Sequence, residues 1–145
     1  MIRAVLDVNV LVSSIPSPQG TPAAIVRSAL LREFQAVVSE LMLESLLDVW
    51  GRPYFRSRLS DEAISDALTN FRSKALVVVP VDDVHGVADD AEDDLVIATA
   101  IAGEATYLVT GDRGLLRQDG YRGLVFITPA DFRLVLDAPA ITVSP

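Results

Sequence analysis

The stretch "DAEDDLVIATAIAGEATYLVTGD", residues 90–112, contains a helix followed by a strand, and this order decides the fold class. Apolar residues recur at helical spacing up to Gly103, a residue type that commonly follows the last turn of a helix. The next segment, from Thr106 to Thr110, is a short apolar run that leads into Gly111 and Asp112. Near-continuous apolar runs of this kind are typical of strands that are buried on both faces of a parallel sheet.

Short apolar runs and helical patterns alternate along the rest of the chain as well. We expect five strands, at residues 2–8, 36–39, 76–81, 106–110 and 124–127, and four helices, at residues 21–34, 40–50, 61–75 and 93–102. Thr21 is followed by proline and Ser60 by two acids, as is common at the first turn of a helix. This alternation predicts a three-layer α/β/α fold with a mainly parallel, about five-stranded sheet.

The composition limits the classes of protein and of site. A chain of 145 residues, half of them hydrophobic, fits one domain, which we expect at residues 1–137, followed by a flexible tail at residues 138–145. No apolar run approaches the ~20 residues of a membrane span, so we expect a cytoplasmic protein without a membrane partner. Because cysteine is absent and His85 is the single histidine, any bound metal must be held by oxygen. A formal charge of -8 argues against a protein that coats nucleic acid by bulk electrostatics.

Two aspartates stand at the ends of expected strands. Asp7 lies at the end of the first strand, and Asp112 follows the fourth. In a parallel sheet both belong to the edge at which open α/β folds bind their ligands. An unpaired ionised carboxylate in an apolar setting is costly, which favours a shared polar site. Structural roles stay open beside this one: Asp7 could form a turn with Asn9, and Asp112 could cap a helix.

A dense run of acids precedes the last expected helix. Residues 89–94 hold five acids in six positions, "DDAEDD". Acids at a helix start complement the helix dipole, which explains any one of them. Together they repel one another, and a divalent cation would relieve that repulsion. Mg²⁺ or Mn²⁺ is the expected ion, because such hard cations prefer carboxylate oxygens.

In this order the motifs resemble those of the PIN domain nucleases, in particular the VapC-like toxin ribonucleases. The opening "LDVNVLVSS" is similar to the family's first-strand Asp-x-Asn motif, "SELMLESLLDVWGRPYF" to its second-helix segment, and residues 90–112 to its third and fourth acidic motifs. The resemblance implies four catalytic acids, Asp7, Glu44, Asp94 and Asp112. It implies four metal ligands, Asp7, Asp93, Asp94 and Asp112. It also implies that Asn9 and Thr110 orient carboxylates or water.

The implied function is a divalent-metal-dependent endoribonuclease that hydrolyses phosphodiester bonds of RNA, as the toxin of a toxin–antitoxin pair with a cognate antitoxin protein. Two departures from the family pattern favour an alternative, a catalytically decayed binding module. Ser45 stands where the helix acid is expected, with Glu44 beside it, and Gly114 stands where a further acid often occurs. A phosphatase with Asp7 as its nucleophile is a third interpretation, although such enzymes usually carry a second acid at the position of Asn9.

The segment "GRPYFRSR", residues 51–58, is the candidate RNA-binding surface. It places Arg52, Arg56 and Arg58 around two aromatic residues, a combination that suits phosphate contacts and base stacking. It could equally be a surface loop whose aromatic side chains pack on the core. Arg113, next to Asp112, could also contact a phosphate. The many apolar residues between positions 40 and 75 exceed what one small sheet face covers, so we expect a homodimer.

Overall fold

The computed structural model of the protein describes residues 1–138, so residues 139–145 of the expected tail lie outside the described residues. Five strands form one sheet, β1 (Arg3–Leu6), β2 (Gln35–Val38), β3 (Leu76–Val77), β4 (Tyr107–Val109) and β5 (Val125–Ile127). The strand order is β3-β2-β1-β4-β5, and every neighbouring pair is parallel. The predicted α/β fold with a parallel five-stranded sheet is confirmed.

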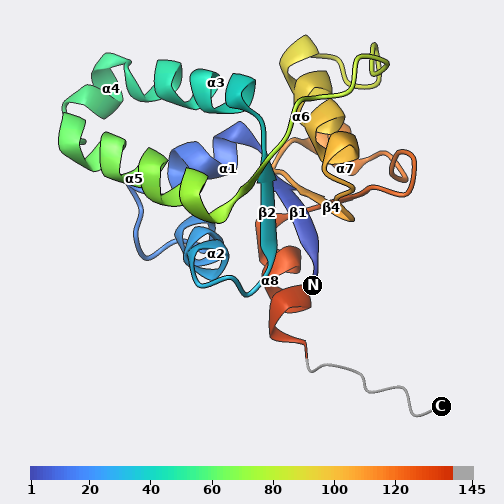
Figure 1. Cartoon of the computed structure of the whole chain (residues 1–145), viewed down its shortest axis with the longest axis horizontal. Helices are drawn as coiled ribbons and strands as arrows, with labels where there is room; N and C mark the ends of the chain where they lie inside the picture. Colours follow the sequence, from blue (N-terminus) through green and yellow to red (C-terminus); the bar gives the residue numbers. More distant parts are fainter. Residues whose placement is uncertain (139–145) are drawn as a thin grey trace.

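Helices cover the sheet on both sides (Figure 1). They are α1 (Val8–Ser13), α2 (Thr21–Leu30), α3 (Glu40–Trp50), α4 (Pro53–Arg56), α5 (Asp61–Lys74), α6 (Ala91–Ala102), α7 (Arg113–Leu116) and α8 (Pro129–Asp137). In Figure 1, α1, α3, α4 and α5 lie on the opposite side of the sheet from α6. Helix α6 packs on β1, β2 and β4, whereas α1 packs against α2 and α3. Within the described part of the chain, no helix is long and apolar enough to span a membrane.

Four of the five predicted strands are shorter than expected, and the first and third lose the most residues. The first ends at Leu6, and the apolar run after Asp7 forms the helix α1 instead. A short apolar run fits a buried helix as well as a buried strand, so periodicity could not separate them. The third has only two residues; Val78 N–H still donates to Val38 O at 2.8 Å, but Pro80 lacks an N–H and cannot extend the ladder.

Besides α1, three further helices were not predicted, α4, α7 and α8. The longest of them, α8, begins after its N-cap Thr128, whose hydroxyl accepts a hydrogen bond from Asp131 N–H at 3.1 Å. It buries Phe132 fully, and the ring of Phe132 contacts that of Phe34 edge-on with a centroid separation of 5.1 Å. Helix α8 therefore belongs to the folded core and covers the start of the sheet.

The strand order places a switch point beside β1. From β1 the chain builds β2 and β3 on one side, and β4 and β5 extend the sheet on the other. The connections on the two sides diverge at this point, which leaves room for a ligand at the carboxyl ends of β1 and β4. Gly103 fits the return from α6 into β4, because a Cβ atom there would overlap the side chain of Val37. The ends of β1 and β4, which carry Asp7 and Asp112, are thereby held as neighbours.

Candidate metal centre

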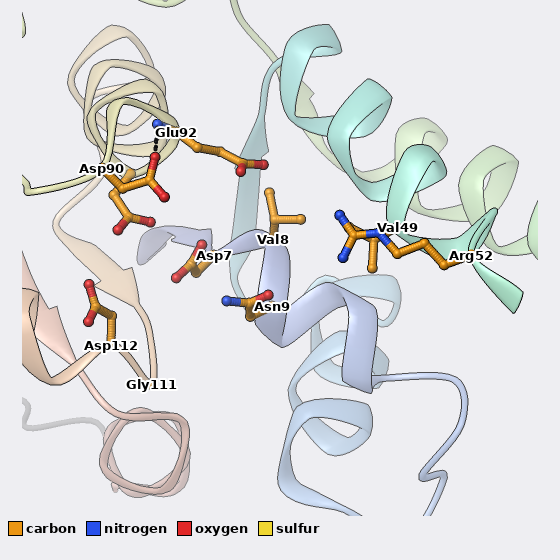
Figure 2. Close-up of a pocket in the computed structure, with 10 residues that line it drawn as sticks. Asp7, Val8, Asn9, Val49, Arg52, Asp90, Glu92, Gly111 and Asp112 are labelled. Carbon is orange, nitrogen blue, oxygen red and sulfur yellow. Dashed lines mark hydrogen bonds between the residues drawn. The ribbon is translucent and has the colours of Figure 1, made fainter. Parts of the chain in front are cut away.

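A hollow of about 540 Å³ lies at the carboxyl ends of β1 and β4 (Figure 2). We call it the acidic pocket, because five of its lining residues are acids. It is lined by Asp7, Val8, Asn9, Val49, Arg52, Asp90, Glu92, Asp93, Gly111 and Asp112. These residues come from three stretches of the chain that carry the first-strand motif, the second-helix motif and the last two acidic motifs. The fold thus gathers residues that are distant in sequence.

Asp7 is the most buried acid of the pocket, with 4% of its surface exposed. It follows β1 directly and stands just before the first residue of α1. The hydroxyl of the buried Thr110 donates to Asp7 Oδ2 at 2.8 Å and accepts from Asp112 N–H at 3.0 Å. One threonine on the β4 side therefore fixes both the Asp7 carboxylate and the backbone that carries Asp112.

Asp112 both caps a helix and lines the pocket. Its Oδ1 accepts from Gly114 N–H at 3.1 Å, so it caps the short helix α7. Its side chain is exposed and lies on the pocket wall. The two roles that the sequence left open for Asp112 do not exclude each other, because a cap uses only part of the accepting capacity of a carboxylate.

The first turn of α6 supplies the remaining acids. Asp90 is the N-cap, and its Oδ1 accepts from Glu92 N–H at 2.9 Å (Figure 2). Glu92 and Asp93 follow it on the pocket wall. The sequence singled out the acidic run but did not name Asp90 or Glu92 as site residues. Their position, at the cap and first turn of a helix that packs on β1, was the signal that could have identified them.

Burial and repulsion by neighbouring acids disfavour the charged forms of Asp7 and Asp93. The pKa of Asp7 is raised, mainly because it is buried, and the hydrogen bond from Thr110 partly offsets this. The pKa of Asp93 is raised to about 7 by burial and then by the negative charges of Asp7, Asp112 and Asp90, with a hydrogen bond to Asp112 adding to the shift. A cation bound beside Asp7 and Asp93 would stabilise their charged forms.

Asp94, which the resemblance implies to be a catalytic acid and a metal ligand, lies outside the pocket. Its carboxylate is buried and accepts three backbone hydrogen bonds, from Gly86 N–H at 2.9 Å, Val87 N–H at 3.1 Å and Ala88 N–H at 2.7 Å. One step along a helix turns a side chain by about 100°, so Asp93 and Asp94 face different surroundings. In this structure Asp93 lines the pocket and Asp94 holds the loop that precedes α6.

Glu44 is also outside the acidic pocket. It is exposed on α3 and lines a separate hollow, together with Leu47, Asp48, Gly51 and Arg52. Ser45, the position at which the family acid is expected, is half-buried and lines neither hollow. Asn9, expected to orient carboxylates or water, is exposed on the pocket wall beside Asp7.

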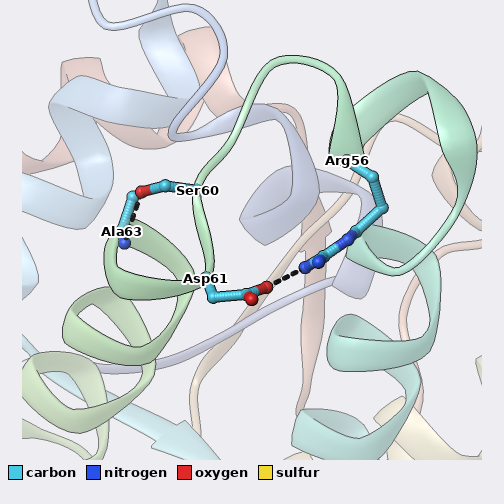
Figure 3. Close-up of polar contacts among 4 residues, drawn as sticks. All are labelled: Arg56, Ser60, Asp61 and Ala63. Carbon is cyan, nitrogen blue, oxygen red and sulfur yellow. Dashed lines mark hydrogen bonds and ion pairs between the residues drawn. The ribbon is translucent and has the colours of Figure 1, made fainter.

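Of the four arginines expected to bind RNA, only Arg52 lines the acidic pocket. Arg56 forms an ion pair with Asp61 at the start of α5, next to the Ser60 cap that accepts from Ala63 N–H (Figure 3). Arg58 lies over the ring of Tyr54, 3.7 Å from its centroid. Arg113 is exposed and is not part of the pocket wall. Local contacts therefore occupy two of the three arginines in residues 51–58.

The donor set of the pocket suits a hard divalent cation. Every charged oxygen on its wall belongs to a carboxylate, and this is the ligand type that Mg²⁺ and Mn²⁺ prefer. Among residues 1–138, no group of three or more acidic or histidine side chains is arranged to hold an ion directly. Mg²⁺ commonly binds through one or two carboxylates and keeps several waters, so a pocket of this size and composition fits a hydrated ion.

Comparisons with known proteins agree with the fold. The sequence model of the family described as PIN domain matches residues 3–114. No curated protein matches the chain. A chain in the crystal structure of VapBC2 from Rickettsia felis bound to a DNA fragment from their promoter is 17% identical, with a TM-score of 0.59, over 88% of this chain and 98% of that chain. A chain of FitAcB from Neisseria gonorrhoeae is 19% identical, with a TM-score of 0.56, over 88% of this chain and 98% of that chain. At these identities the likeness shows a shared fold.

Proposed function

Because the chain belongs to the PIN domain family, we propose that it is a divalent-metal-dependent endoribonuclease that hydrolyses phosphodiester bonds of RNA. The observation that carries the proposal is the acidic pocket. Its buried Asp7 and its half-buried Asp93, whose pKa is raised to about 7, come from separate elements and meet at the switch point of the sheet. A protein that kept these acids for structure alone would hold mutually repelling charges without compensation.

Three carboxylates are the proposed ligands of Mg²⁺ or Mn²⁺: Asp7, Asp93 and Asp112. Thr110 holds Asp7 by a hydrogen bond, and the backbone at Gly114 holds Asp112, so both are oriented before an ion arrives. Asp90 and Glu92 add negative charge at the rim. A bound ion of this kind lowers the pKa of its water and stabilises charge on the phosphate and the leaving oxygen. The side-chain amide of Asn9 lies beside these ligands and can orient water or a phosphate oxygen.

The proposed biological role is that of the toxin in a toxin–antitoxin pair, acting in the cytoplasm. The shared fold with chains of VapBC2 and FitAcB supports this role, and a cognate antitoxin would then be the protein partner. A homodimer is a further proposal. Most apolar residues of α3 and α5 are buried within the chain, but Leu41 and Leu47 on α3 remain 49% and 50% exposed. Light scattering at micromolar concentration should give twice the mass of the chain, and a monomeric mass would remove this part of the proposal.

The nuclease proposal is tested with the purified protein and a fluorescent single-stranded RNA. Cleavage is expected with Mn²⁺ or Mg²⁺ and should stop when EDTA is added. The variant Asp7→Asn keeps the size of the side chain and removes its charge, so it should fold but not cleave. RNA that stays intact with both metals, or cleavage that continues in EDTA and in Asp7→Asn, would contradict the proposal.

One observation favours a second candidate, a decayed module that binds RNA without cutting it. Glu44 lies in a different hollow from the other acids, and its neighbour Ser45 replaces the acid of the family pattern. A pocket with one acid fewer could bind an ion and a phosphate but hydrolyse slowly. Such a module would bind RNA in the cleavage mixture and leave it intact over long incubation.

A further inference from the structure

Arg52 is placed at the acidic pocket by a rigid turn between two helices. It follows Gly51 after the end of α3 and is the N-cap of α4, with Pro53 after it. Its N–H donates to Val49 O at 3.1 Å, and its C=O accepts from Phe55 N–H and Arg56 N–H, both at 3.0 Å. Since both of its backbone groups are hydrogen-bonded, the point from which its side chain extends is fixed.

The guanidinium of Arg52 faces the acids without pairing with them. In Figure 2 it is turned toward Val8 and Asn9, across the pocket from Asp90 and Asp112. The ion pairs of residues 1–138 use four other arginines, Arg3, Arg56, Arg72 and Arg122. Arg52 also takes part in no side-chain hydrogen bond or aromatic stacking contact among the described residues, in contrast to Arg56 and Arg58. Its hydrogen-bond donors are therefore available to a ligand.

A phosphate that enters this pocket meets five carboxylates and one positively charged side chain, because Arg52 is the single basic residue on the wall. The carboxylates repel the negative phosphates of a nucleic acid. A strand that enters the pocket therefore needs a cationic group on the side of the wall that carries no acid. A guanidinium offers paired N–H donors that match the oxygens of a phosphate. We propose that Arg52 binds a non-bridging phosphate oxygen of the RNA strand whose scissile bond lies at Asp7, and so seats that strand against the acidic wall. This inference rests on the proposed nuclease function and adds a substrate-binding residue to it.

The test uses three variants of the full chain. Arg52→Met keeps the length of the side chain and removes its charge, and Arg52→Lys keeps the charge without the paired donors. The control is Arg133→Met, which removes the same charge from an exposed position on α8, outside the acidic pocket. Cleavage of a fluorescent single-stranded RNA with Mn²⁺ is measured under single-turnover conditions, over a range of protein and salt concentrations. Melting curves with and without Mn²⁺ report fold and metal binding.

Arg52→Met should raise the half-saturating protein concentration about tenfold, as expected for the loss of a hydrogen bond to a charged group. A plot of the logarithm of RNA affinity against the logarithm of salt concentration should also become shallower. Its slope should change by about 0.7, the value for one phosphate contact with a single strand. Arg52→Lys should recover part of the affinity, because it keeps the charge. Arg133→Met should match the unmodified protein, and Mn²⁺ should raise the melting temperature of every variant equally.

The outcomes separate this inference from the nuclease proposal. The inference is wrong if the unmodified protein cleaves and Arg52→Met has the same half-saturating concentration and the same salt slope. In that case Arg52 does not bind the phosphate. A lower melting temperature with unchanged RNA binding would show that Arg52 only neutralises the acids, which also overturns the inference. If no protein cleaves, the nuclease proposal fails. Fluorescence anisotropy of the intact RNA in the same mixtures then decides whether the loss of Arg52 weakens binding.

Discussion

Asp93 and Asp94 are neighbours in the first turn of α6, and they belong to two different regions of the molecule. Asp93 lines the acidic pocket, where burial and the charges of Asp7, Asp112 and Asp90 raise its pKa to about 7. Asp94 points to the preceding loop, where three backbone N–H groups from residues 86–88 surround its carboxylate. In the acidic pocket several negative charges lie close together. At the loop a single carboxylate accepts hydrogen bonds from the backbone of the chain itself.

The difference teaches how a structural carboxylate can be told from a functional one. The loop at residues 86–88 supplies Asp94 with the donors that a buried carboxylate needs, so Asp94 stabilises the fold without help from a ligand. In the pocket, Asp7, Asp90 and Asp112 each accept a single hydrogen bond, and the acids repel one another in the protein alone. A region that is unfavourable without a ligand and is kept in a defined shape is a candidate binding site.

Among the variants that test this comparison, the largest effect should come from Asp93→Asn. Removal of a proposed metal ligand should lower the rate of RNA cleavage by more than about 100-fold, beyond the loss that is typical when a residue supporting a ligand is removed. Because the change also removes one of several repelling charges, the metal-free variant should melt at the same temperature as the unmodified protein or higher. Single-turnover cleavage with Mn²⁺ and melting curves in EDTA measure the two effects.

Asp89→Asn is the matched control for this prediction. Asp89 belongs to the same acidic run and is exposed, but it does not line the pocket. The same change of charge at this position should leave cleavage within about twofold, since exposed charges are screened by salt. An equal loss of activity in Asp93→Asn and Asp89→Asn would contradict the prediction. Cleavage would then depend on the net charge of the acidic run and not on which acids line the pocket.

Asp112→Asn should give the next largest effect, a loss of cleavage of about 10- to 100-fold. Asn accepts the hydrogen bond from Gly114 N–H nearly as well as Asp, so the start of α7 should be preserved. Melting temperature should therefore hold while cleavage and the stabilisation by Mn²⁺ both fall. If activity and metal binding stay unchanged, Asp112 acts as a helix cap only.

The sequence predicted the fold, and it placed Asp7 and Asp112 at the edge of the sheet where the acidic pocket lies, because strand ends and acids can be located from patterns alone. Asp7 and Asp112 follow apolar strands that could be recognised, and parallel pairing places such ends together. The helix α1 was missed, since its apolar residues fit a strand equally well. The different surroundings of Asp93 and Asp94 could not be read from the sequence, because they depend on where the loop at residues 86–88 presents its N–H groups. That placement is a tertiary property with no local pattern.

Asp94→Ala tests the structural side of the comparison. Loss of the carboxylate leaves three N–H groups of the loop without an acceptor, which should lower the free energy of unfolding by about 1.5–3 kcal/mol. The free energy of unfolding of Asp94→Asn should lie between those of Asp94→Ala and the unmodified protein. Its remaining side-chain oxygen can still accept hydrogen bonds from Val87 and Ala88, which both bond to Oδ1 of Asp94. Urea denaturation measures these differences. Cleavage per folded molecule should change little, and a loss as severe as that of Asp93→Asn with unchanged stability would identify Asp94 as the ligand that the sequence suggested.

The pH dependence of the metal-free protein should reveal the acidic pocket without any RNA. The folded-state pKa of Asp93, about 7, lies above the usual value of 3.8, so the folded protein binds the proton more tightly than the unfolded chain. The contribution of Asp93 to stability should be greatest below pH 4 and should fall as the pH rises toward and through 7. Asp7 shifts in the same direction. The ion-paired Asp61 and Asp83 have lowered pKa values, so they change the stability only at more acidic pH.

Melting temperatures in EDTA between pH 4.5 and 8 measure this trend. The decline should be smaller in Asp93→Asn, which cannot titrate at this position. Saturating Mn²⁺ should raise the melting temperature most at the alkaline end, where the carboxylates are charged. A metal-free protein whose stability rises steadily over this range would show that its acids are not held in mutual repulsion.

Glu44→Gln should have the smallest effect of all. Glu44 is exposed on α3 and lines a hollow that contains none of the proposed ligands, so its charge is screened from the acidic pocket by solvent. Cleavage, metal stabilisation and melting temperature should each match the unmodified protein, which would leave a site built from Asp7, Asp93 and Asp112. A cleavage loss of 10-fold or more would require α3 to shift during the reaction, because the family position for this acid, Ser45, has no carboxylate to contribute. In that case the pocket would gain its fourth acid only when RNA is bound, and Ser45→Glu would be expected to restore activity to Glu44→Gln.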